Sequence, residues 1–332
     1  MKVSNTHKES ANEILDFISQ NDQFLLSAHV NADGDAIASV LAVSLLLEYL
    51  QKDYFIVFND QEIDSRFNYL QNFDKITHYH DKLDLPIKSA IICDVPGLHR
   101  LGEVEKLLPD YSKIVKIDHH PMEDNFAVIS MVDETASSTT HLVHEIIETL
   151  NMPVSVEMAK AIYTGIVYDT GRFSFSNTSA RDMYICAKMI DAGVDPFEIT
   201  DRIFFSSSFK ALRTIGTGLA HMENYLDGEV IVIYLSHEEM KNNHQGEVEE
   251  LANYSVAIRG GKVGLFIRES KPGFHKVSLR SKCDVDVNEV AKVFGGGGHT
   301  RAAGCRFEAN KEEILEKILA EIEKRLRETL MT

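Results

Sequence analysis

The chain of 332 residues lacks several features that mark particular classes of protein. Its four cysteines form no CxxC pair, which argues against a disulfide framework or a thiolate zinc site and predicts a reducing compartment, the cytoplasm. Its longest apolar run, 36–47, contains two serines and is too short to span a bilayer, so we expect no membrane partner. Residues 1–10 contain no apolar core of the kind found in a signal peptide.

Positive charge is also scarce, and this limits the partners of the protein. Lysine and arginine number 34 against 51 aspartates and glutamates, so the net charge is -17. A protein that binds long nucleic acid normally carries a basic stripe that replaces counterions, and the sequence shows no such stripe. We therefore expect no long nucleic acid as a partner. A phosphate ester bound by this chain would be small or short, with its charge met locally by metal ions and a few arginines.

The remaining composition is typical of a globular α/β protein with two domains. The first half alternates apolar strands with helical patterns, which predicts a doubly wound parallel sheet covered on both faces. We expect a catalytic metal-binding domain over 1–205, a linker helix in 206–226 and a smaller α/β substrate domain over 227–332. Predicted strands are 24–27, 54–58, 90–93, 114–117, 230–235, 262–268 and 276–280; predicted helices are 36–51, 138–150, 156–167, 181–192, 208–226 and 311–330.

Acidic and histidine side chains gather where the predicted strands end. His29, Asp33 and Asp35 stand between the strand 24–27 and the next helix, where doubly wound sheets carry their ligands. One aspartate there could serve only as a helix N-cap, but a histidine with two aspartates exceeds what a cap needs. Asp94 ends a neighbouring strand at the same edge of the sheet, with a simple turn aspartate as the alternative. These residues are candidate metal ligands.

The most informative stretch is Asp118-His119-His120, directly after the apolar run 114–117. Adjacent side chains of an extended segment point to opposite sides. We therefore expect one imidazole to bind metal and the other to face a substrate phosphate, with Asp118 fixing the imidazole orientation. Asp169 ends an apolar helix, where the helix dipole disfavours a carboxylate unless a cation lies nearby. A loop aspartate without a ligand role is the alternative for that position.

The mixture of ligand types predicts both the metal and the class of reaction. Carboxylates combined with imidazoles suit borderline-hard divalent ions such as Mn²⁺ better than thiolate-bound zinc, and Mg²⁺ or Co²⁺ are candidate substitutes. Two such ions about 3.5–4 Å apart can clamp both oxygens of an in-line phosphoryl displacement. The clusters therefore predict a two-metal centre that hydrolyses phosphate esters.

A glycine run and several arginines in the sequence are candidates for contact with the substrate. Glycines allow backbone amides to approach a phosphate or a base closely, although such runs are often only flexible loops. The run matches neither the dinucleotide-binding nor the P-loop pattern. Arginine can bind phosphate through two parallel hydrogen bonds. The candidate substrate-binding residues are Gly296, Gly297, Gly298, His299, Arg280, Arg301 and, more weakly, Arg100.

Two other histidine pairs could be mistaken for metal sites. His141 and His144 stand three residues apart on a predicted helix. We expect no metal there, because no acidic partner of suitable spacing accompanies them. His78 and His80 lie in a segment predicted to be a polar surface loop.

The ordered motifs resemble those of the DHH phosphoesterase superfamily. The matching residues are His29, Asp33 and Asp35, then Asp94, then Asp118-His119-His120, and then Asp169-Thr170-Gly171. The C-terminal half, with 277–281 and 295–304, resembles the DHH-associated substrate domain, so the resemblance covers nearly the whole chain. Size and layout resemble the branch of oligoribonucleases, or nanoRNases, that also act as phosphatases on adenosine 3′,5′-bisphosphate (pAp).

This resemblance implies roles for individual residues. It assigns Asp94 as the ligand shared by two manganese ions and His120 as the contact to the scissile phosphate, and it places Asp94, Asp118 and His120 in the catalytic machinery. It assigns Arg280 and the 296–299 loop to the distal part of the nucleotide. The implied metal ligands are His29, Asp33 and Asp94 for one ion and Asp35, Asp94, His119 and Asp169 for the other.

The resemblance implies hydrolysis of short oligonucleotides to mononucleotides and of pAp to AMP. Linear or cyclic dinucleotides are the main alternative substrates, because the catalytic motifs do not separate these reactions. An inorganic pyrophosphatase would share the motifs of the first domain but would not need the glycine–histidine loop. The intact ligand set argues against a catalytically silent nucleotide sensor. A homodimer is compatible with these features.

Overall fold

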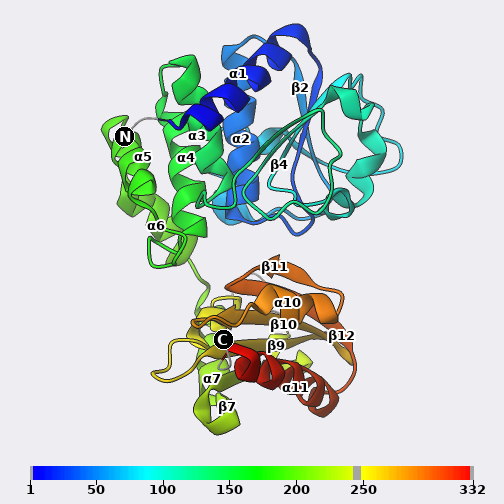
Figure 1. Ribbon diagram of the computed structural model, residues 1–332, viewed down its shortest axis with the longest axis vertical. Helices are drawn as coiled ribbons and strands as arrows, with labels where there is room; N and C mark the ends of the chain where they lie inside the picture. The colour runs from blue at the N-terminus through cyan, green and yellow to red at the C-terminus, as the bar shows by residue number, and fades with distance from the viewer. Residues whose placement is uncertain (1–2, 242–247, 330–332) are drawn as a thin grey trace. The chain divides into compact units, whose positions relative to one another are not determined.

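The computed structural model describes residues 3–241 and 248–329. The chain divides into two compact units, Met1–Ser206 and Ser207–Thr332 (Figure 1). Among the described residues, no helix combines the length and the apolar character that crossing a bilayer requires.

The first unit is built on a six-stranded sheet in the order β3-β2-β1-β4-β5-β6, and every neighbouring pair is parallel. The predicted parallel sheet is therefore confirmed. The central strands β1, β4 and β5 are buried throughout, which explains why most of their residues are apolar. The strands are β1 (Phe24–Ser27), β2 (Tyr54–Phe58), β3 (Ile76–His78), β4 (Ser89–Cys93), β5 (Ile114–Asp118) and β6 (Ile129–Val132).

Alternate residues of these strands enter two different apolar cores. Phe24 and Leu26 of β1 pack in the larger core with the α-helices, whereas Leu25 packs on the opposite face against Leu101 and Val104 of η3. The helices of this unit are α1 (Asn5–Gln20), α2 (Gly34–Tyr49), α3 (Thr139–Leu150), α4 (Val156–Asp169), α5 (Ala180–Asp191) and α6 (Pro196–Phe204), with 3-10 segments η1 (Ser65–Phe67), η2 (Phe73–Lys75), η3 (Leu98–Leu107) and η4 (Tyr111–Lys113).

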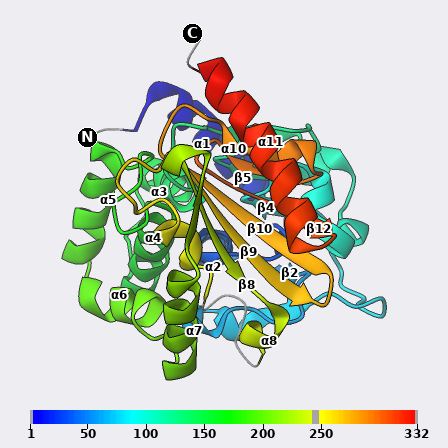
Figure 2. The same cartoon turned by 90° about the horizontal axis from the view of Figure 1, so that it is seen from below.

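The second unit contains a mixed sheet in the order β11-β12-β10-β9-β8-β7, in which only β8 and β9 are parallel among the described pairs. Helix α11 lies across one face of this sheet (Figure 2) and shares an apolar core with α10, while α7 and α9 cover the other face. The elements are α7 (Phe209–Ala220), β7 (Glu223–Tyr225), η5 (Leu226–Gly228), β8 (Val230–Leu235), α8 (His237–Met240), α9 (Leu251–Tyr254), β9 (Val263–Lys271), β10 (Phe274–Ser281), α10 (Val287–Val293), β11 (Gly297–His299), β12 (Ala302–Glu308) and α11 (Lys311–Thr329).

The predicted strands are all present, three of them with identical bounds, but several other expectations need correction. The helix predicted over 208–226 ends at Ala220, and the chain then forms the edge strand β7. The glycine run is not only a loop, because Gly297–His299 pairs with β12. His78 ends β3 and is not in a polar loop. The predicted end of the last helix, residue 330, lies outside the described residues. The elements that the sequence does not predict are α1, α6, α8, α9, β3, β6, β7, β11 and β12.

Candidate metal centre

The parallel sheet brings the predicted ligands of the first unit to one edge. Strand β4 lies between β1 and β5, so the residues that follow these three strands are neighbours in space. Helix α2 begins at the same edge, and α4 packs against α2 and ends there. The residues placed in this way are His29 after β1, Asp33 and Asp35 at the start of α2, Asp94 after β4, Asp118, His119 and His120 at the end of β5, and Asp169 at the end of α4.

The first group of ligand atoms comes from His29, Asp33 and Asp94, whose donor atoms all lie within 4.8 Å of one another. Nδ1 of His29 lies 3.0 Å from the Val30 carbonyl, and its Nε2 lies 3.3 Å from Oδ2 of Asp94. Asp33 also caps α2, because its Oδ1 accepts hydrogen bonds from the backbone N–H groups of Asp35 and the following residue at 3.0 and 3.1 Å. The N-cap alternative is therefore correct for Asp33, and the cap holds its carboxylate within the group.

The second group consists of Asp35, Asp94 and His119, again with donor atoms within 4.8 Å of one another. Asp35 is fully buried and accepts the first two backbone N–H groups of α3, from Thr139 at 2.6 Å and Thr140 at 3.1 Å. The hydroxyl of Thr140 donates to the same carboxylate at 2.7 Å. These amides have no partner within the helix, and the helix dipole favours an anion beside them. The start of α3 therefore fixes the Asp35 carboxylate.

Asp94 belongs to both groups, and it also forms a third group with Asp118 and His120. Its position follows from the sheet order, since β4 is the strand between β1 and β5. Its φ of 60° is uncommon for a residue with a side chain, and such backbone conformations occur preferentially at functional sites. The hydroxyl of Thr139 donates to its Oδ1 at 2.9 Å. Asp94 is thus both buried and held from a second element.

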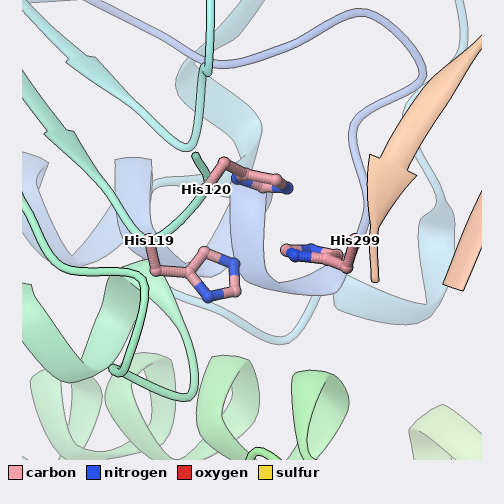
Figure 3. A group of neighbouring side chains, drawn as sticks. All are labelled: His119, His120 and His299. Carbon is pink, nitrogen blue, oxygen red and sulfur yellow. The ribbon is translucent and has the colours of Figure 1, made fainter. Parts of the chain in front are cut away.

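His119 and His120 do not diverge as the sequence predicts. Strand β5 ends at Asp118, so the alternation of side chains no longer applies to the two histidines. Their ring centroids are 4.7 Å apart, and each ring places a nitrogen within 3.5 Å of Oδ1 of Asp94. Nε2 of His119 also lies 3.1 Å from Oδ2 of Asp169. Figure 3 shows both rings beyond the end of β5, and it labels His299 on β11 of the second unit.

Asp118 contacts both the side chain and the backbone of His120. Its Oδ1 lies 2.8 Å from Nδ1 of His120 and also accepts the backbone N–H of that residue at 3.1 Å. Its other oxygen lies 3.3 Å from Nζ of Lys116, and both of these side chains are fully buried. Asp118 therefore connects an imidazole of the site to a cation inside the sheet.

The convergence of carboxylates raises the pKa of two of them. Burial and the charge of Asp169 raise the pKa of Asp33 to about 6. Burial and the charge of Asp94 raise the pKa of Asp35 well above its usual range. Burial also opposes ionisation of Asp94, but the charge and hydrogen bond of His120 outweigh it and hold the pKa of Asp94 well below its usual range. A cation at this edge would stabilise the ionised form of every one of these carboxylates.

The same carboxylates favour the protonated form of the two imidazoles and raise their pKa values. Burial disfavours the charged form of His119, yet its hydrogen bond to Asp169 raises its pKa to about 9. For His120, the charge of Asp94 and the hydrogen bond to Asp118 likewise outweigh burial and raise its pKa well above the usual range.

The donor set fits divalent cations. Buried oxygens from aspartates and nitrogens from histidines converge in two groups that share one carboxylate, and this combination suits Mn²⁺ and similar ions. The nearest thiol in sequence, Cys93, is fully buried in the apolar core, and burial raises its pKa well above the usual range. A thiolate ligand or nucleophile is therefore not part of this arrangement.

The predicted substrate residues of the second unit lie on β10 and β11 or directly beside β11. Arg280 on β10 donates to the Asn253 side chain at 3.0 Å and to a neighbouring carbonyl. Strand β11 lies two strands away from β10, with β12 between them. A Cβ at Gly296 would collide with the backbone of β12, and Gly298 has a φ of 147°, so these two positions need glycine. Nη2 of Arg301 lies 3.6 Å from Asp284.

Arg100 belongs to the first unit, in η3, and the structure gives it a backbone role. Its carbonyl accepts the N–H of Val30 at 2.7 Å, which fastens the segment after His29.

Three residues that help to position the candidate ligands are not among those predicted from the sequence. Thr139 and Thr140 hold Asp94 and Asp35, and the signal was the polar run 137–140 before an apolar helix. Gly165 on α4 leaves room for this arrangement, because a Cβ there would meet the Thr140 side chain and would lie 2.5 Å from Oδ1 of Asp35.

His141 has acidic partners, contrary to the expectation that none accompanies this histidine pair, and neither His141 nor His144 belongs to a ligand group among the described residues. Nδ1 of His141 lies 2.7 Å from Asp182, and Nε2 lies 3.5 Å from Glu145, so acidic partners do accompany it. These two carboxylates pair directly with the His141 imidazole and form a buried charge network with it. His144 is 1% exposed, and burial lowers its pKa to about 3.

Comparison with known proteins is consistent with this geometry. A model of the DHH family, N-terminal domain, matches residues 23–166, and a model of the DHHA1 domain matches residues 227–328. The chain is 28% identical over 304 residues to the bifunctional oligoribonuclease and PAP phosphatase NrnA of Thermus thermophilus, covering 91% of this chain and 89% of that protein. It is 27% identical over 319 residues to the protein of the same name from Bacillus subtilis, covering 94% and 97%.

A solved structure shows the same fold along nearly the whole chain. An exopolyphosphatase-related protein from Bacteroides fragilis superimposes with a TM-score of 0.86 at 26% identity, covering 96% of each chain. The chain therefore belongs to the DHH phosphoesterases, with a DHH-family N-terminal domain followed by a DHHA1 domain.

Proposed function

We propose that this chain is a manganese-dependent hydrolase of phosphoric esters that cleaves short oligonucleotides to mononucleotides and converts pAp to AMP. The observation that carries the proposal is Asp94, a buried carboxylate shared by two groups of ligand atoms. Family membership and the relatives named oligoribonuclease and PAP phosphatase support the same reaction class and substrates. The spread of isolated cysteines supports a reducing, cytoplasmic setting.

Two divalent ions bound by the ligand groups would supply an activated water and would neutralise charge on the phosphoryl oxygens. The side chains of the protein prepare this chemistry. The start of α3 fixes Asp35, and Thr139 fixes Asp94, so the ligands are held before the substrate arrives. Asp118 engages Nδ1 of His120, so a proton given to the leaving oxygen would come from Nε2. His120 also places positive charge where negative charge develops.

We assign binding of the nucleotide to the domain that follows the linker. Arg280 offers a planar cation for a phosphate, and the 296–299 segment offers backbone amides next to glycines that permit close approach. The proposed boundaries are a catalytic domain over 1–205, a linker over 206–226 and a substrate domain over 227–332.

A substrate panel with the purified full chain tests this function. The panel holds pAp, RNA and DNA of two to ten nucleotides, linear and cyclic dinucleotides, and pyrophosphate, each with Mn²⁺, Mg²⁺ or Co²⁺. We expect hydrolysis of pAp and short oligonucleotides, with the highest rate in Mn²⁺. Asp94→Asn should lose activity on every substrate, whereas Asp81→Asn, at an exposed aspartate, should retain it. Turnover of pyrophosphate or of dinucleotides alone would replace the proposed substrates, and full activity of Asp94→Asn would refute the site.

A further inference from the structure

A lysine lies fully buried inside the central sheet, next to the proposed site. Lys116 is the third residue of β5 and stands in an otherwise apolar run. Side chains two residues apart on a strand point to the same face, so Lys116 shares its face with Asp118. Both side chains have no exposed surface. Burial of a lysine is costly unless charged or polar partners surround its ammonium group, so its retention there calls for a role.

The ammonium group of Lys116 has three sets of neighbours. It donates a hydrogen bond of 2.8 Å to the carbonyl of Pro96, in the loop that follows Asp94. It forms an ion pair of 3.3 Å with Oδ2 of Asp118. It also lies 5.4 Å from the centre of the buried Phe126 ring. Lys116 therefore links the loop that carries the shared ligand to the end of the strand that carries the histidines.

The Asp118 carboxylate connects this lysine to His120. Its Oδ2 faces Lys116, while its Oδ1 faces Nδ1 of His120 at 2.8 Å. A carboxylate held at both oxygens cannot turn about its own bond, so the imidazole keeps one orientation. Without the lysine, Oδ2 would be a buried charge without its counter-charge, and the carboxylate would be expected to rotate or to move toward water.

We propose that Lys116 is a positioning residue for the hydrolytic reaction, acting through Asp118 on the orientation of His120. This inference rests on the proposed function, because the activity measured is hydrolysis of pAp. Lys116 contacts neither a proposed metal ligand nor, in this role, the substrate. Its removal should therefore lower kcat and leave both KM and the affinity for Mn²⁺ nearly unchanged.

A double-mutant cycle separates this role from a purely structural one. Lys116→Met keeps an unbranched side chain that is one atom shorter and removes the charge, and we expect kcat for pAp to fall about 10–100-fold, as for other supporting residues of metal sites. In the His120→Ala background the same substitution should change kcat less than about twofold, because the residue through which Lys116 acts is gone. Ile114→Val, at a buried position on the same face of β5, serves as the packing control and should retain the wild-type kcat.

The outcomes distinguish this inference from the proposed function. If wild-type protein does not hydrolyse pAp, the proposed function is wrong. If wild-type protein is active but Lys116→Met lowers kcat by the same factor with and without His120, or lowers Mn²⁺ affinity instead, the positioning role is wrong. If Lys116→Met does not fold, the double variant with Asp118→Asn removes both buried charges together. Its kcat should equal that of Asp118→Asn alone, and a further loss would overturn the inference.

Discussion

His144 offers a test of the fold that does not depend on catalysis. The side chain lies on α3 with 1% of its surface exposed, and its Nδ1 has no hydrogen-bond partner among the described residues. Burial lowers its pKa from 6.5 to about 3, and the nearby cations Lys188 and Arg181 act in the same direction. We predict that His144→Leu makes the protein less sensitive to acid, because leucine is apolar and similar in volume.

The expected magnitude follows from the two pKa values. As the pH falls below 6.5, the unfolded chain takes up a proton at His144 while the folded chain does not, so the free energy of unfolding decreases. A pH of 5.0 is about 1.5 units below the pKa of the imidazole in the unfolded chain. This difference corresponds to about 2 kcal/mol of lost stability. At pH 7.5 the same contribution is close to zero. His144→Leu should therefore gain about 2 kcal/mol relative to wild type between pH 7.5 and 5.0.

Urea unfolding followed by circular dichroism at both pH values, with chelator present so that metal binding does not change with pH, measures this difference. Comparison with wild type is essential because His141 acts in the opposite direction. Its pKa is raised to about 9, so it contributes stability that is complete below pH 6.5 and is lost as the pH rises through 9. His80→Leu, at an exposed histidine, is the matched control and should show no comparable gain. A stability difference between His144→Leu and wild type that stays constant from pH 7.5 to 5.0 would refute the reasoning.

Three further predictions concern positions where the structure sets the available space or a single hydrogen bond. Gly165→Ala should lower kcat and Mn²⁺ affinity about 10–100-fold in a turnover and titration assay, because its Cβ would displace the Asp35 carboxylate. Gly216→Ala, in the interior of α7 with nothing within 4 Å of the new Cβ, should instead raise the free energy of unfolding by about 1 kcal/mol. Thr139→Val should lower kcat about tenfold by removing the hydroxyl that bonds Asp94, whereas Thr139→Ser should retain activity; equal rates for valine and serine would exclude that role.

The sequence predicts the first sheet well because its central strands are buried on both faces. Such strands are short and mainly apolar runs, and the prediction for β1 has the bounds that the structure shows. Edge strands carry no such pattern. Strand β3 is three residues long and partly exposed, and β6 is only partly buried, so neither stands out from a loop. Strand β11 consists of two glycines and a histidine, and its pairing with β12 is set by close backbone approach that composition alone does not reveal.

In the candidate site, too, features that depend on neighbouring residues can be predicted from the sequence, whereas contacts between distant residues cannot. The convergence of candidate ligands such as His29 and Asp94 can be predicted, because each follows a recognisable strand and parallel strands end at one edge. The residues that hold them could not, because their partners are far away in sequence. Thr140 meets Asp35 across 105 positions, and the hydroxyl of Thr139 meets Asp94 across 45. The packing of α3 against α2 and against the sheet at β5 brings these groups together.

Helix α3 has to be held firmly, because a displacement of its first turn would move the hydrogen bonds to Asp35. The same helix carries charged contacts further along its length. Glu145 pairs with His7 of α1 and with Arg181 of α5 at 3.0 Å, and His141 pairs with an aspartate of α5 at 2.7 Å. Because these partners come from two other helices, they restrain both sliding and rotation of α3. Breaking a buried pair of this kind leaves an uncompensated charge, which is strongly unfavourable. The precision of the ligand groups at one end of α3 therefore depends on a charge network at its middle that contains none of the proposed metal ligands.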